Sequence, residues 1–182
     1  MFIIANKTGQ LGNRLFLFSH FIACAIENNF TVVNPSFDEY AAFFKTTSKD
    51  IFCRYPQSKS LLYKNKLARK FSLKLTQELT KQIAKNQINN PFLRVIKLEN
   101  LNLELDFGEQ VFCLDNPSFV KTINPKQITF VHGWLFRDYS NLGKHADTVR
   151  SFFEPLDTFQ NNVIKIVKKV RKEADILIGI HI

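Results

Sequence analysis

Two glycines in the first polar segment of the chain could bring the backbone close to a ligand. They stand in Gly9-Gln10-Leu11-Gly12-Asn13-Arg14, between a short apolar run and a segment with helical periodicity. The N–H groups at the start of the following helix suit a phosphate or a sugar hydroxyl. Candidate substrate-binding residues are therefore Gln10, Leu11, Gly12 and Asn13. An ordinary tight turn explains the pattern equally well, and the spacing matches neither the dinucleotide fingerprint nor a Walker loop.

Two further segments carry side chains that could take part in binding or catalysis. Trp134, the only tryptophan, follows Gly133 and precedes Arg137 near the predicted end of a strand. An aromatic face with hydrogen-bonding neighbours can hold a sugar ring, so Trp134 and Arg137 form a candidate acceptor shelf. A core tryptophan beside a surface Arg–Asp ion pair is the alternative. His181 is a further candidate substrate-binding residue, because it lies at the carboxyl end of the last apolar run, where parallel sheets present functional residues. A lone histidine in such a strand is more often a packed, hydrogen-bonded residue.

The elements that must position these residues alternate between strand and helix. A strand at Phe2–Ala5, a helix over 13–28 and a strand at Thr31–Val33 make an opening βαβ unit. Shorter β-like runs follow at 92–98, 101–105, 111–114 and 128–135, helices at 144–153 and 158–173, and a last strand from Asp175. We predict an α/β fold with a mainly parallel sheet and helices on both faces.

Composition fits a globular protein with one domain as the default, since the chain has 182 residues and 45% hydrophobic content. Nineteen phenylalanines predict an aromatic-rich interior or a large apolar interface. The three cysteines have no metal-binding spacing and indicate free thiols in a reducing compartment. With neither a signal-peptide pattern nor an apolar run of membrane-spanning length, we expect a cytoplasmic protein.

The net charge of +9 is concentrated in one segment. Residues 59–85 hold eight basic residues against the single acid Glu78, a net charge of +7. A solvated lysine face is the favoured interpretation, and peripheral contact with acidic lipid is the alternative. Leu67, Phe71 and Leu75 form an i,i+4 stripe that needs a partner surface. The segment lacks the aromatic and arginine pattern of nucleic-acid modules, so we expect no nucleic-acid partner.

In their order, these segments resemble the N-terminal portion of an α-1,2-fucosyltransferase-like glycosyltransferase, within the GDP-fucose-using superfamily. The family opens with a strand and a G-x-L-G-N-Q-type turn into a phenylalanine-containing helix, here Gly9–Phe16 with Arg14 at the usual glutamine position. A G-Y/W-aromatic block, here Gly133–Phe136, precedes a helix with an Ile/Val-Arg pair, here Val149-Arg150. Residues 36–128 add almost nothing to the match.

The family then has an H-x-R-R-x-D motif after a hydrophobic strand, of which the sequence holds His181-Ile182. The resemblance implies a GT-B-type enzyme, with residues 1–174 as a Rossmann-like lobe, the basic helical segment 59–90 within it, and 175–182 as the first strand of a donor-binding lobe. The motif's arginines, which in relatives neutralise the leaving phosphate, would follow Ile182. We therefore expect these 182 residues alone not to catalyse transfer.

The implied reaction is an inverting, metal-independent transfer of fucose from GDP-fucose to a glycan hydroxyl, with no further cofactor. Asp38, Glu39 and Asp138 are candidates for the catalytic base by residue type and loop position alone. Two alternatives stay open. One is another nucleotide-sugar-dependent transferase, and the other is a non-catalytic module that docks on acidic surfaces through its basic helix.

Overall fold

A five-stranded, mainly parallel sheet forms the centre of the computed structural model, which describes residues 1–86, 88–106 and 108–174. The strand order is β3-β2-β1-β7-β4, and only β3 is antiparallel to its neighbour. The strands span Phe2–Ile4 (β1), Val32–Val33 (β2), Arg54–Tyr55 (β3), Leu93–Lys97 (β4) and Ile128–His132 (β7). The predicted sharing of one sheet by the runs at 2–5, 31–33 and 128–131 is confirmed, whereas the run from Asp175 lies outside the described residues.

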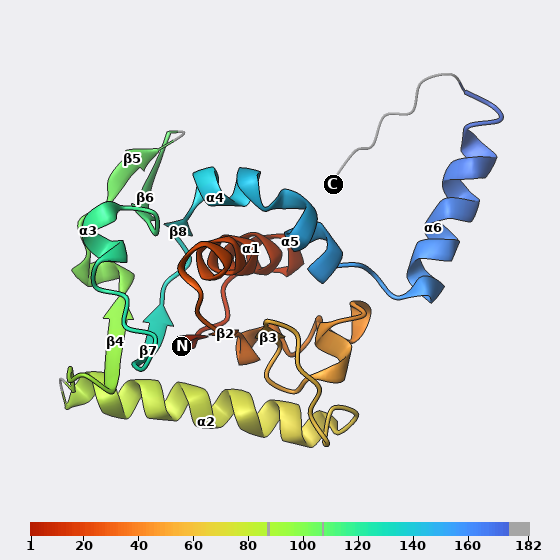
Figure 1. Cartoon of the computed structure of the whole chain (residues 1–182). Helices are drawn as coiled ribbons and strands as arrows, with labels where there is room; N and C mark the ends of the chain where they lie inside the picture. Colours follow the sequence, from red (N-terminus) through yellow and green to blue (C-terminus); the bar gives the residue numbers. More distant parts are fainter. Residues whose placement is uncertain (87, 107, 175–182) are drawn as a thin grey trace.

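Helices cover both faces of this sheet, as predicted. Helix α1 (Leu11–Asn28) lies on one face and α2 (Lys66–Lys85) on the other (Figure 1). Helices α4 (Tyr139–Lys144) and α5 (Ala146–Phe152) pack beside α1. The helix predicted over 144–153 is confirmed as α5, whereas α4, which ends just before His145, was not predicted. Helix α6 (Asp157–Val170) lies away from the sheet in Figure 1.

Short elements connect these layers. A second sheet has the order β5-β6-β8, with β5 at Glu104–Asp106, β6 at Glu109–Cys113 and β8 at Phe136–Arg137. The four-residue helix α3 covers Pro117–Val120. Within the described ranges, 3-10 helices occupy Pro35–Phe37, Ala41–Phe43, Thr47–Lys49 and Leu98–Asn100.

The core is rich in phenylalanine, as the composition predicted. Phe2, Phe18, Phe21, Phe37 and Phe136 are almost completely buried. Their rings meet mostly at tilted or edge-on angles, for example Phe18 with Phe37 at a centroid distance of 5.8 Å. Such pairs add to the free energy gained by burying the rings, so they fix the orientation of α1 on the sheet.

Gly133 supports a stability prediction, because its backbone and surroundings both exclude a side chain. Its φ is +140°, and an added β-carbon would lie 2.5 Å from the Leu98 β-carbon. Gly133→Ala should therefore lower the free energy of unfolding by about 1–3 kcal/mol, measured by urea denaturation. Gly143→Ala is the control, because that α4 position opens into free space and should change stability by no more than about 1 kcal/mol. Equal stability of the two variants would contradict the prediction.

Candidate functional site at the carboxyl edge of the sheet

The carboxyl ends of three parallel strands meet at one edge of the sheet. β7 lies between β1 and β4, with Ile4 opposite Val131 and Lys97 opposite His132. Just past the strand ends, the backbone N–H of Gly133 donates to Asn6 Oδ1 at 3.0 Å. The strand order changes direction here, since β2 lies on one side of β1 and β7 with β4 on the other. Ligands of open α/β sheets bind at such points.

The turn predicted to bind substrate leads from this edge into α1. Gln10, Gly12 and Asn13 are exposed, and Leu11 packs partly against the core. The backbone N–H groups of residues 11–13 have no acceptor within the described part of the chain, and no side chain caps the helix. Space beside Gly12 is open, so a ligand can reach these donors. Gly9, at φ +55°, has no room for a β-carbon because of the Asn13 side chain.

Arg14 points away from this surface and holds the turn in place. Its Nε donates to the Gly9 carbonyl at 3.1 Å, and its Nη1 donates to the Ser36 carbonyl at 3.1 Å and to Glu39 Oε2 at 2.9 Å. Its guanidinium also lies 5.0 Å from the centre of the Tyr40 ring. Arg14 is buried, so its contacts position the turn and do not reach a ligand.

The two motifs that the sequence placed far apart meet at Phe16. The Arg137 guanidinium carbon lies 4.8 Å from the centre of the Phe16 ring and 5.3 Å from that of Trp134. Phe16 follows Gly12 by one helical turn, so both lie on the same side of α1. Trp134 and Phe16 expose 41% and 39% of their surface, and together they form an aromatic face beside the start of the helix.

Arg137 supports this aromatic face from below. It is only 2% exposed and donates to the carbonyls of Trp134 at 2.7 Å and Phe136 at 3.0 Å. Trp134 thus offers the surface that an acceptor shelf needs, while Arg137 fixes the ring and does not present donors to solvent. Phe16 ends the motif that carries the resemblance but was not among the predicted binding residues, although its i,i+4 spacing from Gly12 was a usable signal.

The three carboxyl groups named as candidate bases are all engaged. Asp138 is buried and caps α4, accepting from Asn141 N at 3.0 Å, and burial raises the pKa of its carboxyl. Asp38 pairs with Lys7 at 2.9 Å. Glu39 pairs with Lys7 at 2.8 Å and with Arg14, and the hydrogen bond from Lys7 is the main cause of its lowered pKa. His181 lies outside the described residues.

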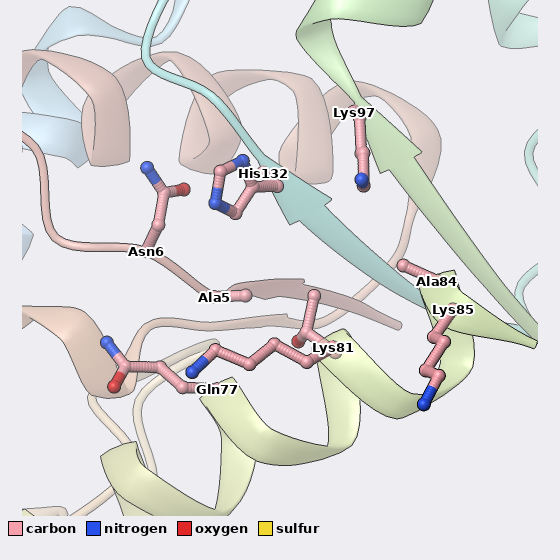
Figure 2. A pocket seen from close by; sticks show the side chains of 9 residues that line it. Ala5, Asn6, Gln77, Lys81, Ala84, Lys85, Lys97 and His132 are labelled. Atoms are coloured by element: carbon pink, nitrogen blue, oxygen red, sulfur yellow. The ribbon is translucent and has the colours of Figure 1, made fainter.

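A cavity of about 500 Å³ opens on the α2 side of the same edge (Figure 2). Its basic lining consists of Lys81 and Lys85 from α2, Lys97 at the end of β4 and His132 at the end of β7, with Asn6 beside them. Lys97 pairs with Glu99 at 3.4 Å, whereas Lys81 and Lys85 have no ion-pair partner among the residues described. Cationic walls of this kind suit a phosphate or another anionic group. The basic helix was predictable from the sequence, whereas the cavity was not.

Among residues 1–86, 88–106 and 108–174, no group of three or more His, Cys, Asp or Glu side chains is placed to hold a metal ion. Comparison with protein-family models, with curated proteins and with solved structures finds no match to this chain.

Proposed function

We propose that this protein is a nucleotide-sugar-dependent glycosyltransferase that transfers fucose from GDP-fucose to a glycan hydroxyl with inversion, through an α-1,2-type reaction. The observation that carries the proposal is the meeting of the two predicted motifs beside one sheet edge. The start of α1 with Gly12 and Asn13 adjoins the face of Phe16 and Trp134. The resemblance supplies the choice of fucose and GDP.

Three neighbouring surfaces could each bind a different part of such substrates. The uncapped N–H groups of α1 and the Asn13 amide offer hydrogen bonds to sugar hydroxyls or phosphate oxygens. The aromatic face of Phe16 and Trp134 can lie against a sugar ring. The basic cavity next to Asn6 can receive an anionic part of the donor or the acceptor.

None of the three candidate carboxyls is free to take the proton of the acceptor hydroxyl. Glu39 is the most exposed of the three candidates, but two cations hold it in the ionised form and reduce its proton affinity. Asp138 is committed to the cap of α4. We therefore assign the described residues to binding and positioning, and name no catalytic base.

Asn13→Ala tests the proposal in the protein purified at its natural length. We expect kcat/KM for GDP-fucose transfer to fall by about 10- to 100-fold, because an amide that meets developing charge or a sugar hydroxyl is lost. The melting temperature should hardly change, since Asn13 is exposed. The matched control is Asn162→Ala, at an exposed position of α6, which should leave transfer unchanged.

Three outcomes would count against the proposal in different ways. Equal losses of stability and activity in Asn13→Ala would make the turn structural. Turnover of another nucleotide sugar, with none for GDP-fucose, would select the broader transferase alternative. Absence of turnover with every nucleotide sugar tested would reject the proposal that the protein is a glycosyltransferase.

A further inference from the structure

Helix α2 turns its more apolar side toward solvent. The strip Leu67, Phe71, Leu75 and Leu79 follows i,i+4 spacing along the outer side, and Leu67 and Phe71 expose 77% and 67% of their surface. The buried side is weakly apolar and consists of Arg69, Ser72, Leu73, Thr76, Thr80 and Ile83. The stripe that the sequence predicted would need a partner surface therefore has none among the described residues.

The contacts of the inner side fix this orientation. Arg69 donates to the carbonyls of Thr47, Ser48, Asp50 and Tyr63 at 2.8–3.2 Å. The hydroxyls of Thr76 and Thr80 are satisfied within the helix, by the carbonyls of Ser72 at 2.8 Å and Thr76 at 2.7 Å. Rotation of α2 to bury the leucine strip would break the Arg69 contacts and expose this satisfied surface. The outward strip is thus part of the folded state.

Helix α2 as a whole carries a strong positive charge. Five lysines lie on α2, at positions 66, 70, 74, 81 and 85, against the single acid Glu78. At 100° per residue, Lys70, Lys74 and Glu78 fall within about 60° of Leu67 around the helix axis, whereas Lys81 and Lys85 line the cavity at the sheet edge. None of these lysines has an ion-pair partner among the described residues. The apolar strip, Lys70 and Lys74 therefore share one outer face, which we call the α2 outer face.

This combination selects one kind of partner. Two copies of the chain that met through the α2 outer face would bring like charges together. Nucleic acid would neutralise the lysines and leave Phe71 and Leu75 in water. A bilayer with anionic headgroups meets both needs, since it buries apolar side chains at the acyl boundary and attracts lysines.

We propose that the α2 outer face docks this protein on anionic membranes, with the helix lying in the plane of the interface. The helix is about 30 Å long and runs along the lower edge of the molecule in Figure 1, with the sheet and α1 above it. None of the described helices is long and apolar enough to cross a membrane. The docking goes beyond the proposed transferase activity and does not depend on it.

Vesicle flotation tests the docking directly. The protein should float with phosphatidylcholine vesicles only when they contain phosphatidylglycerol, and salt should weaken the binding. Lys70→Gln with Lys74→Gln should lower the partition coefficient about 25-fold, from about fivefold per lysine. Phe71→Ser should lower it about tenfold or more. These positions lie outside the cavity lining, so the cavity is untouched.

The controls remove the same chemistry from elsewhere on the surface. Phe92 is 74% exposed just before β4, and Lys126 is exposed in the turn before β7. Phe92→Ser and Lys126→Gln should leave binding unchanged. The proposal is overturned if the protein does not float, if it binds neutral vesicles equally well, or if the controls weaken binding as much as the α2 variants. A dimer in sedimentation that Phe71→Ser dissolves, without vesicle binding, would assign the face to a second copy.

Discussion

Replacing Arg69 with alanine should lower the free energy of unfolding by about 3–5 kcal/mol, because it leaves buried carbonyls without a donor. The guanidinium reaches the carbonyls of Thr47, Ser48, Asp50 and Tyr63 and joins the first turn of α2 to the loop that precedes β3. Arg69 is 8% exposed, so water cannot easily replace these bonds. Urea denaturation measures the loss.

Lys70→Ala is the matched control, since it removes a neighbouring basic side chain that points to solvent. Its effect should stay within about 0.5 kcal/mol. Arg69→Lys should fall between the two variants, because one ammonium cannot reach four carbonyls that a planar guanidinium spans. If Arg69→Ala and Lys70→Ala lost the same stability, the buried network would not hold α2, and the outward orientation of its apolar strip would lose its support.

The parts of the fold that the sequence predicted are those with long or strongly patterned signals. The apolar spacing of Leu15, Phe18 and Ile22 places α1 within two residues of its observed start. The βαβ order then predicts the parallel neighbours of β1. By contrast, β3 and β8 contain two residues each, too few for any periodicity to develop. Their positions follow from tertiary pairing.

Helix α2 shows why a correct helix prediction can leave its buried face undetermined. Apolar periodicity points to Leu67, Phe71 and Leu75, yet these side chains are exposed. The buried side depends on hydroxyls that bond within the helix and on Arg69, most of whose partners lie about 20 residues earlier in the chain. Apolar periodicity does not assign such polar residues to a core, because it does not detect that their hydrogen-bonding groups are satisfied in the folded state.

The candidate site likewise has a part that the sequence predicts and parts that it does not. The turn at Gly9–Arg14 was recognisable because strand, glycines and helix follow one another in the sequence. The contact of Trp134 with Phe16 through Arg137 was not, since it joins residues more than 100 positions apart. The basic cavity was not predictable either, because it forms where the carboxyl ends of β4 and β7 lie next to α2, and the order of the strands in the sheet determines that arrangement.

Stability should also fall as the pH drops below about 6.5, because His20 is buried in its neutral form beside the aromatic face. Its Nδ1 accepts from the Asp138 N–H at 2.8 Å, and its ring lies between those of Phe16 and Tyr139, at centroid distances of 4.5 Å and 4.9 Å. Burial, with a smaller contribution from the Arg137 charge, lowers the pKa of His20 to about 4.

The direction of this pH effect follows from the number of protons that the folded and unfolded states bind. Between about pH 6.5 and pH 4 the unfolded chain binds a proton on His20 and the folded chain does not, so acid favours unfolding and the loss reaches about 3 kcal/mol. Above this window His20 is neutral in both states and contributes no pH dependence. The raised pKa of Asp138 acts in the opposite direction, since the folded state then binds its proton more readily.

Comparison with His20→Gln separates these two groups, because the glutamine carbonyl can accept the Asp138 N–H while Asp138 itself is retained in both proteins. The difference in unfolding free energy between wild type and variant should change by about 3 kcal/mol from neutral pH to pH 4. The fluorescence of Trp134, the only tryptophan, should report the loosening, since the Asp138 N–H that His20 accepts adjoins Arg137, which contacts Trp134. Parallel pH profiles for the two proteins would show that His20 is not held neutral, and the aromatic face would then need another source of its order.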